Sequence, residues 1–154
     1  MEFVSFEIAK KLKEKGFDRP CIYAYCEQGG WNRYTQKHDP ITYILRTDGN
    51  PFGSFYVGKN WNIKYERNKN KIRCSAPTIS QVLKWLRKEK KISIEPTIHC
   101  TLKWVSGIYS FDDDGLADFS QYTVEGTDDT VYILYDSYEQ AALAGIEYVL
   151  DNLI

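Results

Sequence analysis

The chain has 154 residues, 43% hydrophobic and 15% aromatic, and its 20 Lys and Arg against 21 Asp and Glu leave a formal net charge of −1. This length suits a single globular domain over 1–154, because about 150 residues bury roughly 68–70% of their unfolded surface. The aromatic content excludes disorder, and the apolar runs are far shorter than the roughly 18 residues that a membrane-spanning helix needs. The N-terminus lacks the features of a secretory signal, so we expect a cytoplasmic protein that does not enter a membrane.

The chain opens with a predicted helix over about 5–15. Ser5 is its expected N-cap, and apolar residues recur behind it at helical spacing. Gly16 stands where a left-handed residue ends a helix, and Phe17 beside it is placed to contact Leu12. The pattern therefore predicts both the start and the end of this helix.

The stretch 20–74 is predicted to be rich in strands, because runs of strand-forming residues alternate with turn residues. Two hairpins are expected, one from Cys21–Glu27 and Trp31–Thr35 around Gly29-Gly30, the other from Ile41–Arg46 and Phe52–Val57 around Asp48-Gly49-Asn50-Pro51. The polar segment 59–73 that follows is expected to be a ragged strand or a long loop.

A second helix is predicted after Pro77, where Thr78 and Gln81 have the spacing of a capping box. Its apolar stripe is expected to comprise Ile79, Val82, Leu83 and Leu86. Four more strands are predicted beyond it, over Ile92–Glu95, Thr97–Phe111, Asp118–Val124 and Val131–Tyr135.

A third helix is predicted over about 138–153, with a second capping box from Ser137 to Gln140. Gly145 in its middle costs about 1 kcal/mol relative to alanine, so we expect another backbone to approach closely there. The order of elements predicts an α+β fold, with an antiparallel meander-type sheet and about three helices packed on one face.

The charges are strongly polarised along the chain. Residues 1–103 hold all 20 basic residues and ten acidic ones, while 104–154 hold eleven acidic residues and no Lys or Arg. Either the two parts neutralise each other at the surface, or a basic patch, an acidic patch or both survive and steer a partner.

The densest basic segment interleaves cations with aromatic rings, which is the combination that a single-stranded nucleic-acid groove uses. The same rings are equally explained as core-facing strand residues. The candidate nucleic-acid-binding residues are Lys59, Trp61, Lys64, Tyr65, Arg67, Lys69, Lys71 and Arg73.

The sequence contains none of the motifs of a nucleophile elbow, a phosphate loop, a dinucleotide fold or a zincin. His99 and Cys100 are adjacent, but neighbours on a strand point to opposite faces, so they do not form a catalytic pair. The four cysteines, Cys21, Cys26, Cys74 and Cys100, are expected to be scattered, reduced and mostly buried thiols. No catalytic residue, metal site or cofactor is predicted.

Three stretches together resemble a family of small, uncharacterised proteins encoded by phages and prophages of gut bacteria. They are Ala9–Cys21 (AKKLKEKGFDRPC), Ser75–Glu95 (SAPTISQVLKWLRKEKKISIE) and Asp136–Leu150 (DSYEQAALAGIEYVL). The resemblance implies a cytoplasmic α+β domain made in a bacterial host, and it brings no activity, cofactor or catalytic residue. The shared segments contain the capping residues and core stripes, so folding alone explains them.

These observations favour a phage-type accessory protein that binds a host or phage protein without catalysis, since Tyr and Trp often anchor interfaces. The alternative is single-stranded nucleic-acid binding through residues 59–73. A hydrolase or transferase with an unrecognised site is the third interpretation.

Overall fold

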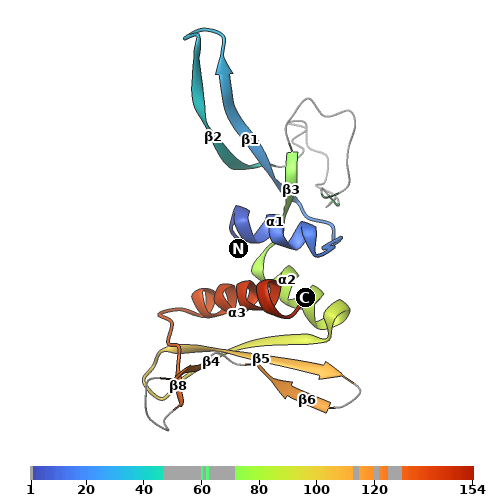
Figure 1. The fold of residues 1–154 in the computed structure, drawn as a ribbon, viewed down its shortest axis with the longest axis vertical. Helices are drawn as coiled ribbons and strands as arrows, with labels where there is room; N and C mark the ends of the chain where they lie inside the picture. Colours follow the sequence, from blue (N-terminus) through green and yellow to red (C-terminus); the bar gives the residue numbers. More distant parts are fainter. Residues whose placement is uncertain are drawn as a thin grey trace. The chain divides into compact units, whose positions relative to one another are not determined.

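The computed structural model describes residues 2–46, 60, 62, 72–112, 115–119, 122–124 and 130–154. The chain divides into two compact units, which we call the N-terminal unit (Phe3–Pro77) and the C-terminal unit (Thr78–Ile154 with Met1–Glu2). The α+β class is confirmed, because three α-helices accompany antiparallel sheets in the described residues (Figure 1). The single domain and the packing of the helices on one face of one sheet stay predictions.

Helix α1 (Phe6–Glu14) begins and ends as the sequence predicts. The Ser5 hydroxyl accepts a hydrogen bond from the Ile8 N–H at 3.3 Å, which satisfies one of the unpaired N–H groups of the first turn. At the other end Gly16 has φ +85°, and the Phe17 N–H donates to the Leu12 carbonyl at 2.9 Å. This is the hydrogen bond of a Schellman ending.

The sheet of the N-terminal unit has the strand order β2-β1-β3 and is antiparallel throughout. Its strands are β1 (Tyr23–Asn32), β2 (Lys37–Arg46) and β3 (Ile72–Ala76). The first predicted hairpin is wrong, because β1 runs through Gly29-Gly30 and its two predicted strands do not pair with each other. The chain reverses at 33–36 instead, and β1 pairs with β2, whose residues Ile41–Arg46 were assigned to the second predicted hairpin. The second predicted hairpin, with its strand at Phe52–Val57, lies outside the described residues beyond β2.

Gly29 marks a bulge rather than a turn. Gln28 pairs with Thr42 and Gly30 with Asp39, so the single residue Gly29 faces two residues of β2. It has φ +111°, and a Cβ there would overlap the carbonyl oxygen of Pro40. Gly29 is therefore needed because β2 approaches its backbone closely, and not because the chain turns there.

Helix α2 (Ile79–Trp85) starts with the predicted capping box, because Thr78 and Gln81 bond to each other's backbone N–H groups. It continues into a π-helical turn, η1 (Leu86–Lys90), that no sequence pattern indicated. Trp85 and Leu86 are buried there, whereas the predicted core residue Leu83 is half-buried. The π-helical turn ends at Lys91, which has φ +58°.

The C-terminal unit contains a three-stranded antiparallel sheet of order β4-β5-β6 and a two-stranded one of β7 and β8. The strands are β4 (Ile92–Ile98), β5 (Trp104–Asp112), β6 (Gly115–Asp118), β7 (Tyr122–Val124) and β8 (Thr130–Tyr132). The continuous strand predicted over 97–111 is wrong, because a turn at residues 99–103 separates β4 from β5.

Helix α3 (Tyr138–Asn152) lies across one face of β4 and β5 (Figure 1). The Ser137 hydroxyl caps it, accepting from the Gln140 N–H at 3.1 Å, but the Gln140 side chain accepts from the Asp136 N–H instead of completing the predicted box. A Cβ at Gly145 would overlap Ser106 Oγ and lie 2.7 Å from Ile94 Cγ2. The close approach is thus confirmed, although side chains rather than a backbone make it.

Candidate protein-docking surface

The hairpin β1–β2 extends beyond the third strand of its sheet. Strand β3 pairs with β1 only over Tyr23–Cys26, whereas β2 pairs with β1 as far as Asn32. From Glu27 to Asn32 the described sheet is therefore a two-stranded ribbon, with β2 at its edge. Such a ribbon has few residues to bury its side chains.

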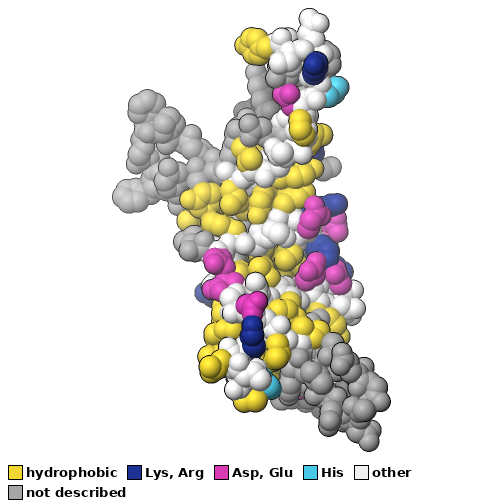
Figure 2. Space-filling model, turned by 90° about the vertical axis from the view of Figure 1, so that its left-hand side faces the viewer, with side chains coloured by type: hydrophobic (Ala, Val, Ile, Leu, Met, Phe, Trp, Pro, Cys, Tyr) yellow, Lys and Arg dark blue, Asp and Glu magenta, His cyan; other side chains and the backbone are white. Residues whose placement is uncertain are grey.

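One side of β2 carries an exposed apolar stripe, which we define as Ile41, Tyr43 and Leu45. These residues are 56%, 41% and 39% exposed, and their two-residue spacing places them on one face of the strand. Thr42 between them is also exposed, and Ile44 is half-buried. Apolar side chains gather along the hairpin between its tip and the level of α1 (Figure 2). An exposed apolar edge strand is a typical site for pairing with another chain.

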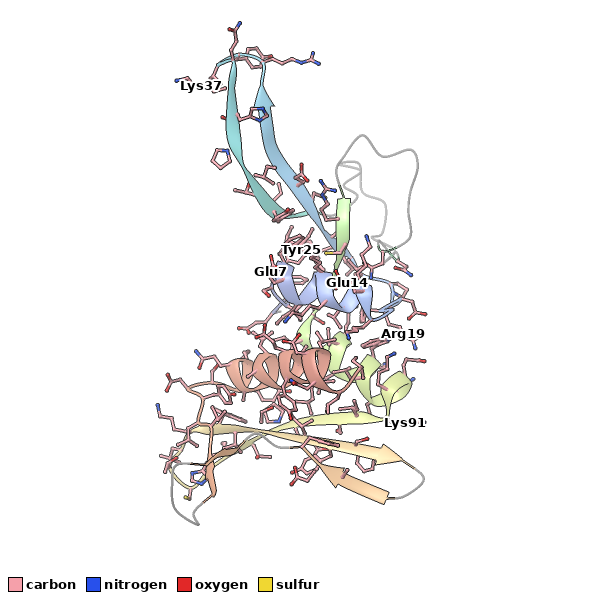
Figure 3. All side chains as sticks on the ribbon, in the orientation of Figure 1. Glu7, Glu14, Arg19, Tyr25, Lys37 and Lys91 are labelled. Carbon is pink, nitrogen blue, oxygen red and sulfur yellow. The ribbon has the colours of Figure 1, made fainter. Side chains whose placement is uncertain are left out.

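Helix α1 supports the base of this stripe. The Phe6 ring stacks on Tyr43, with 3.6 Å between centroids and 10° between planes, and meets Tyr25 edge-on at 5.5 Å. The Tyr25 hydroxyl donates to the Val4 carbonyl at 2.6 Å, and the side chain lies between the hairpin and α1 (Figure 3). Burial, with a smaller contribution from Cys74, raises the Tyr25 pKa. The stack on Phe6 holds the Tyr43 ring of the stripe in one orientation before any partner binds.

The two units carry opposite formal charges. The N-terminal unit has 14 Lys and Arg against seven Asp and Glu, a net charge of +7. The C-terminal unit has six against 14, a net charge of −8. At the hairpin's tip Arg33 and Lys37 are exposed, and Lys37 projects away from the strands (Figure 3). The stripe therefore lies on a unit with a positive net charge, which favours a negatively charged partner.

Of the eight candidate nucleic-acid-binding residues, Lys59, Trp61, Lys64, Tyr65, Arg67, Lys69 and Lys71 lie outside the described residues. Arg73 is described, at the start of β3, where its guanidinium pairs with Glu27. The Glu27 side chain is only 5% exposed, so this pair compensates a buried charge. The Arg73 carbonyl also accepts from Lys13 Nζ at 2.7 Å. Arg73 thus has a structural partner, and its use in nucleic-acid binding stays a prediction.

His99 and Cys100 lie in the turn between β4 and β5, which corrects the reason given against their pairing. They are not neighbours on a strand, and Cys100 Sγ lies 3.5 Å from His99 Nδ1. Thr101 Oγ1 lies 3.0 Å from the same nitrogen. Cys100 is exposed, so reagents dissolved in the solvent can reach its thiol. The wrong strand assignment had hidden this arrangement.

The other three cysteines are buried in the N-terminal unit and form no disulfide bond, as the sequence predicts for most of its thiols. Burial raises the Cys21 pKa to about 11 and the Cys74 pKa to about 12. The nearby thiols Cys26 and Cys21 also raise the Cys74 pKa, so the three side chains share one core rather than being scattered. Among the described residues no group of three or more His, Cys, Asp or Glu side chains is arranged to hold a metal ion.

No family model, no curated protein and no solved structure matches the chain. In the described part of the chain, no helix combines the length and the apolar character that crossing a membrane requires.

Proposed function

We propose that the chain is a non-catalytic protein-binding module that docks a partner on the apolar stripe of β2. In keeping with the resemblance to phage and prophage proteins, the proposal places it in a bacterial cytoplasm, with a host or phage protein as partner. The observation that carries the proposal is the exposure of three large apolar side chains on one face of an edge strand.

Two further features support a binding role for this surface. The Phe6 stack positions Tyr43 in advance, which lowers the entropy cost of binding. Tyrosine is also among the residues that contribute most at interfaces, because its ring offers a large area with few rotatable bonds. A stripe of this kind supplies the apolar centre of an interface, and the charged tip supplies part of its rim.

The test uses the full chain as bait for a bacterial lysate divided into nuclease-treated and untreated halves. The variant Ile41→Thr/Leu45→Thr removes two of the three apolar side chains of the stripe and retains strand-forming residues. Ile98→Thr is the matched control, since Ile98 is 60% exposed at the end of β4 in the other unit. We expect the wild type and the Ile98→Thr control to capture the same protein in stoichiometric amount from both halves of the lysate. The stripe variant should fail to capture it. Equal retention by all three chains would contradict the proposed site.

The second candidate function is single-stranded nucleic-acid binding through residues 59–73. The +7 charge of the N-terminal unit supports it, because phosphates release counterions when cations neutralise them. A titration with a single-stranded oligonucleotide should then show log affinity falling linearly with log salt. Replacing Lys64, Arg67, Lys69 and Lys71 with Ala should reduce both the affinity and that slope, and an unchanged affinity would remove this candidate.

A further inference from the structure

We propose that the partner of β2 is an acidic protein segment in an extended conformation, which adds to the sheet as a strand beside β2. This inference rests on the proposed function and adds the binding mode and the chemistry of the partner. The segment would carry apolar side chains at alternate positions and acidic ones between them.

The edge position of β2 carries the first step of the argument. Strand β2 is ten residues long, and among the described strands β1 is its sole neighbour. A strand with one neighbour presents backbone N–H and C=O groups along its other edge, and an extended chain can pair with them. The bulge opposite Gly29 and the missing N–H of Pro40 interrupt that edge, so the segment from Ile41 onward is where a partner can pair continuously.

The side chains carry the second step. An added strand presents alternate residues to the two faces of the sheet, and one of these faces bears the apolar stripe. Valine-like residues at every second position would cover Ile41, Tyr43 and Leu45 as cross-strand neighbours. The opposite face bears Thr42, which is polar, and Ile44, which is already half-buried. This face therefore exposes less apolar surface for a partner strand to cover than the face with the stripe. An alternating sequence therefore matches both faces.

Charge carries the third step and selects the partner. The unit that bears β2 has a net charge of +7. Near the tip of the hairpin two basic residues, Arg33 and Lys37, and one acidic residue, Asp39, are exposed, so the tip is also net basic. A second copy of the same unit would bring an equal positive charge to the edge, whereas an acidic segment would be attracted to it. Charge complementarity thus favours an acidic partner over self-pairing of β2.

The experiment measures binding of three fluorescent peptides to the full chain by anisotropy. The probe alternates Val and Glu, the charge control alternates Val and Lys, and the backbone control is the Val/Glu peptide N-methylated at alternate residues. We expect the Val/Glu probe to bind at least about tenfold more tightly than either control, since each control loses the charge attraction or several hydrogen bonds. Raising the salt from about 0.1 M to 1 M should narrow the gap between the Glu and Lys peptides, because the screening length falls from about 10 Å to 3 Å.

Two results separate this inference from the proposed function. If the stripe variant Ile41→Thr/Leu45→Thr loses the captured protein while the N-methylated and parent peptides bind equally, the surface is correct and strand addition is overturned. If the stripe variant and Ile98→Thr retain the captured protein alike, the proposed function fails as well. Equal affinity for the Glu and Lys peptides would overturn the acidic partner alone.

Two other occupants of the edge are also distinguishable. Hydrogen exchange of the free chain should show fast exchange at the outward-facing amides of β2 and protection when the Val/Glu probe is bound. Protection in the free chain at every concentration would mean that residues 52–57, predicted as a strand, already pair with β2. Protection that grows with protein concentration would mean a second copy does so. Either result would overturn the proposal.

Discussion

The two units differ in how a helix covers the apolar side chains of the sheet. In the C-terminal unit α3 covers β4 and β5 with fully buried residues such as Ile146 and Val149, and the facing residues Ile94 and Ile108 are buried too. In the N-terminal unit α1 packs near β3, while the outer strand β2 leaves its apolar stripe exposed. Large apolar side chains are exposed in both units, but in the N-terminal unit three of them, Ile41, Tyr43 and Leu45, alternate along one face of a single edge strand.

The cores also differ in their chemistry. The N-terminal core contains three thiols, a buried tyrosine hydroxyl and a carboxylate paired with Arg73. The buried residues of the C-terminal unit are mainly aliphatic and small side chains, together with Trp85. The N-terminal unit should therefore respond more strongly to pH and to the loss of single polar partners.

The largest contrast is expected in thiol reactivity. Cys100 of the C-terminal unit is exposed, while Cys21 and Cys74 of the N-terminal unit are buried and have pKa values raised to about 11 and about 12. Because the thiolate is the nucleophile, a pKa raised by two to three units slows alkylation by about 100- to 1000-fold at pH 8, and burial slows it further. Mass spectrometry after a pulse of iodoacetamide should find Cys100 labelled alone. Labelling of Cys74 at a similar rate would show that the N-terminal core opens readily.

The same raised pKa values predict a loss of stability at alkaline pH in the N-terminal unit. A thiol with an ordinary pKa of 9.0 and a folded pKa near 11 or 12 binds more protons in the folded state between these values, so the free energy of unfolding falls as pH rises through that window. Burial raises the Tyr25 pKa in the same unit and the Tyr135 pKa in the other. Urea melts at pH 8 and pH 10 should show the larger decrease for N-terminal probes. Cys74→Ala should reduce the pH dependence, and an unchanged dependence would contradict the assignment.

The next effect concerns the buried carboxylate. Arg73→Met should destabilise the N-terminal unit by about 2 kcal/mol, because it leaves the 5% exposed Glu27 side chain without its guanidinium. Half of the Arg73 side chain is exposed, so solvent screening keeps the loss of stability moderate. The double variant Glu27→Gln/Arg73→Met is the control and should recover most of the stability in a urea melt. If the single and double variants melt alike, the pair contributes little.

The local signals in the sequence predicted helix ends well. Ser5, Gly16 and the Thr78–Gln81 pair act within a few residues, so their consequences were readable without the fold. The turn at 33–36 was missed, because Gly29-Gly30 looked like a turn and its true reason, the approach of Pro40, comes from the paired strand. The exposure of Ile41, Tyr43 and Leu45 could not be predicted either. Alternation gives the face of a strand, whereas its place at the edge depends on pairing with distant residues.

The helix α3 provides a test of close packing in the C-terminal unit. Gly145→Ala should cost roughly 1–2 kcal/mol, since overlap with Ser106 Oγ and Ile94 Cγ2 outweighs the gain of about 1 kcal/mol in helix propensity. Ser106→Ala by itself should be neutral or slightly stabilising, because its buried hydroxyl has no hydrogen-bond partner in the described structure. Gly145→Ala/Ser106→Ala should recover part of the loss by thermal melting. No recovery would assign the clash to Ile94.

The smallest effects, at the helix caps, bear most directly on whether the two units unfold together. Ser5→Ala and Ser137→Ala each remove a hydroxyl that accepts an N–H of a first turn, and each should cost about 0.5–1 kcal/mol. Site-resolved hydrogen exchange can measure such small changes in each unit separately. If the units are independent, Ser5→Ala lowers protection in α1 and β1 and leaves α3 unchanged, and Ser137→Ala does the reverse. If residues 1–154 form one cooperative domain, either substitution lowers the protection of the most stable amides in both units by the same amount. That result would support the single-domain prediction.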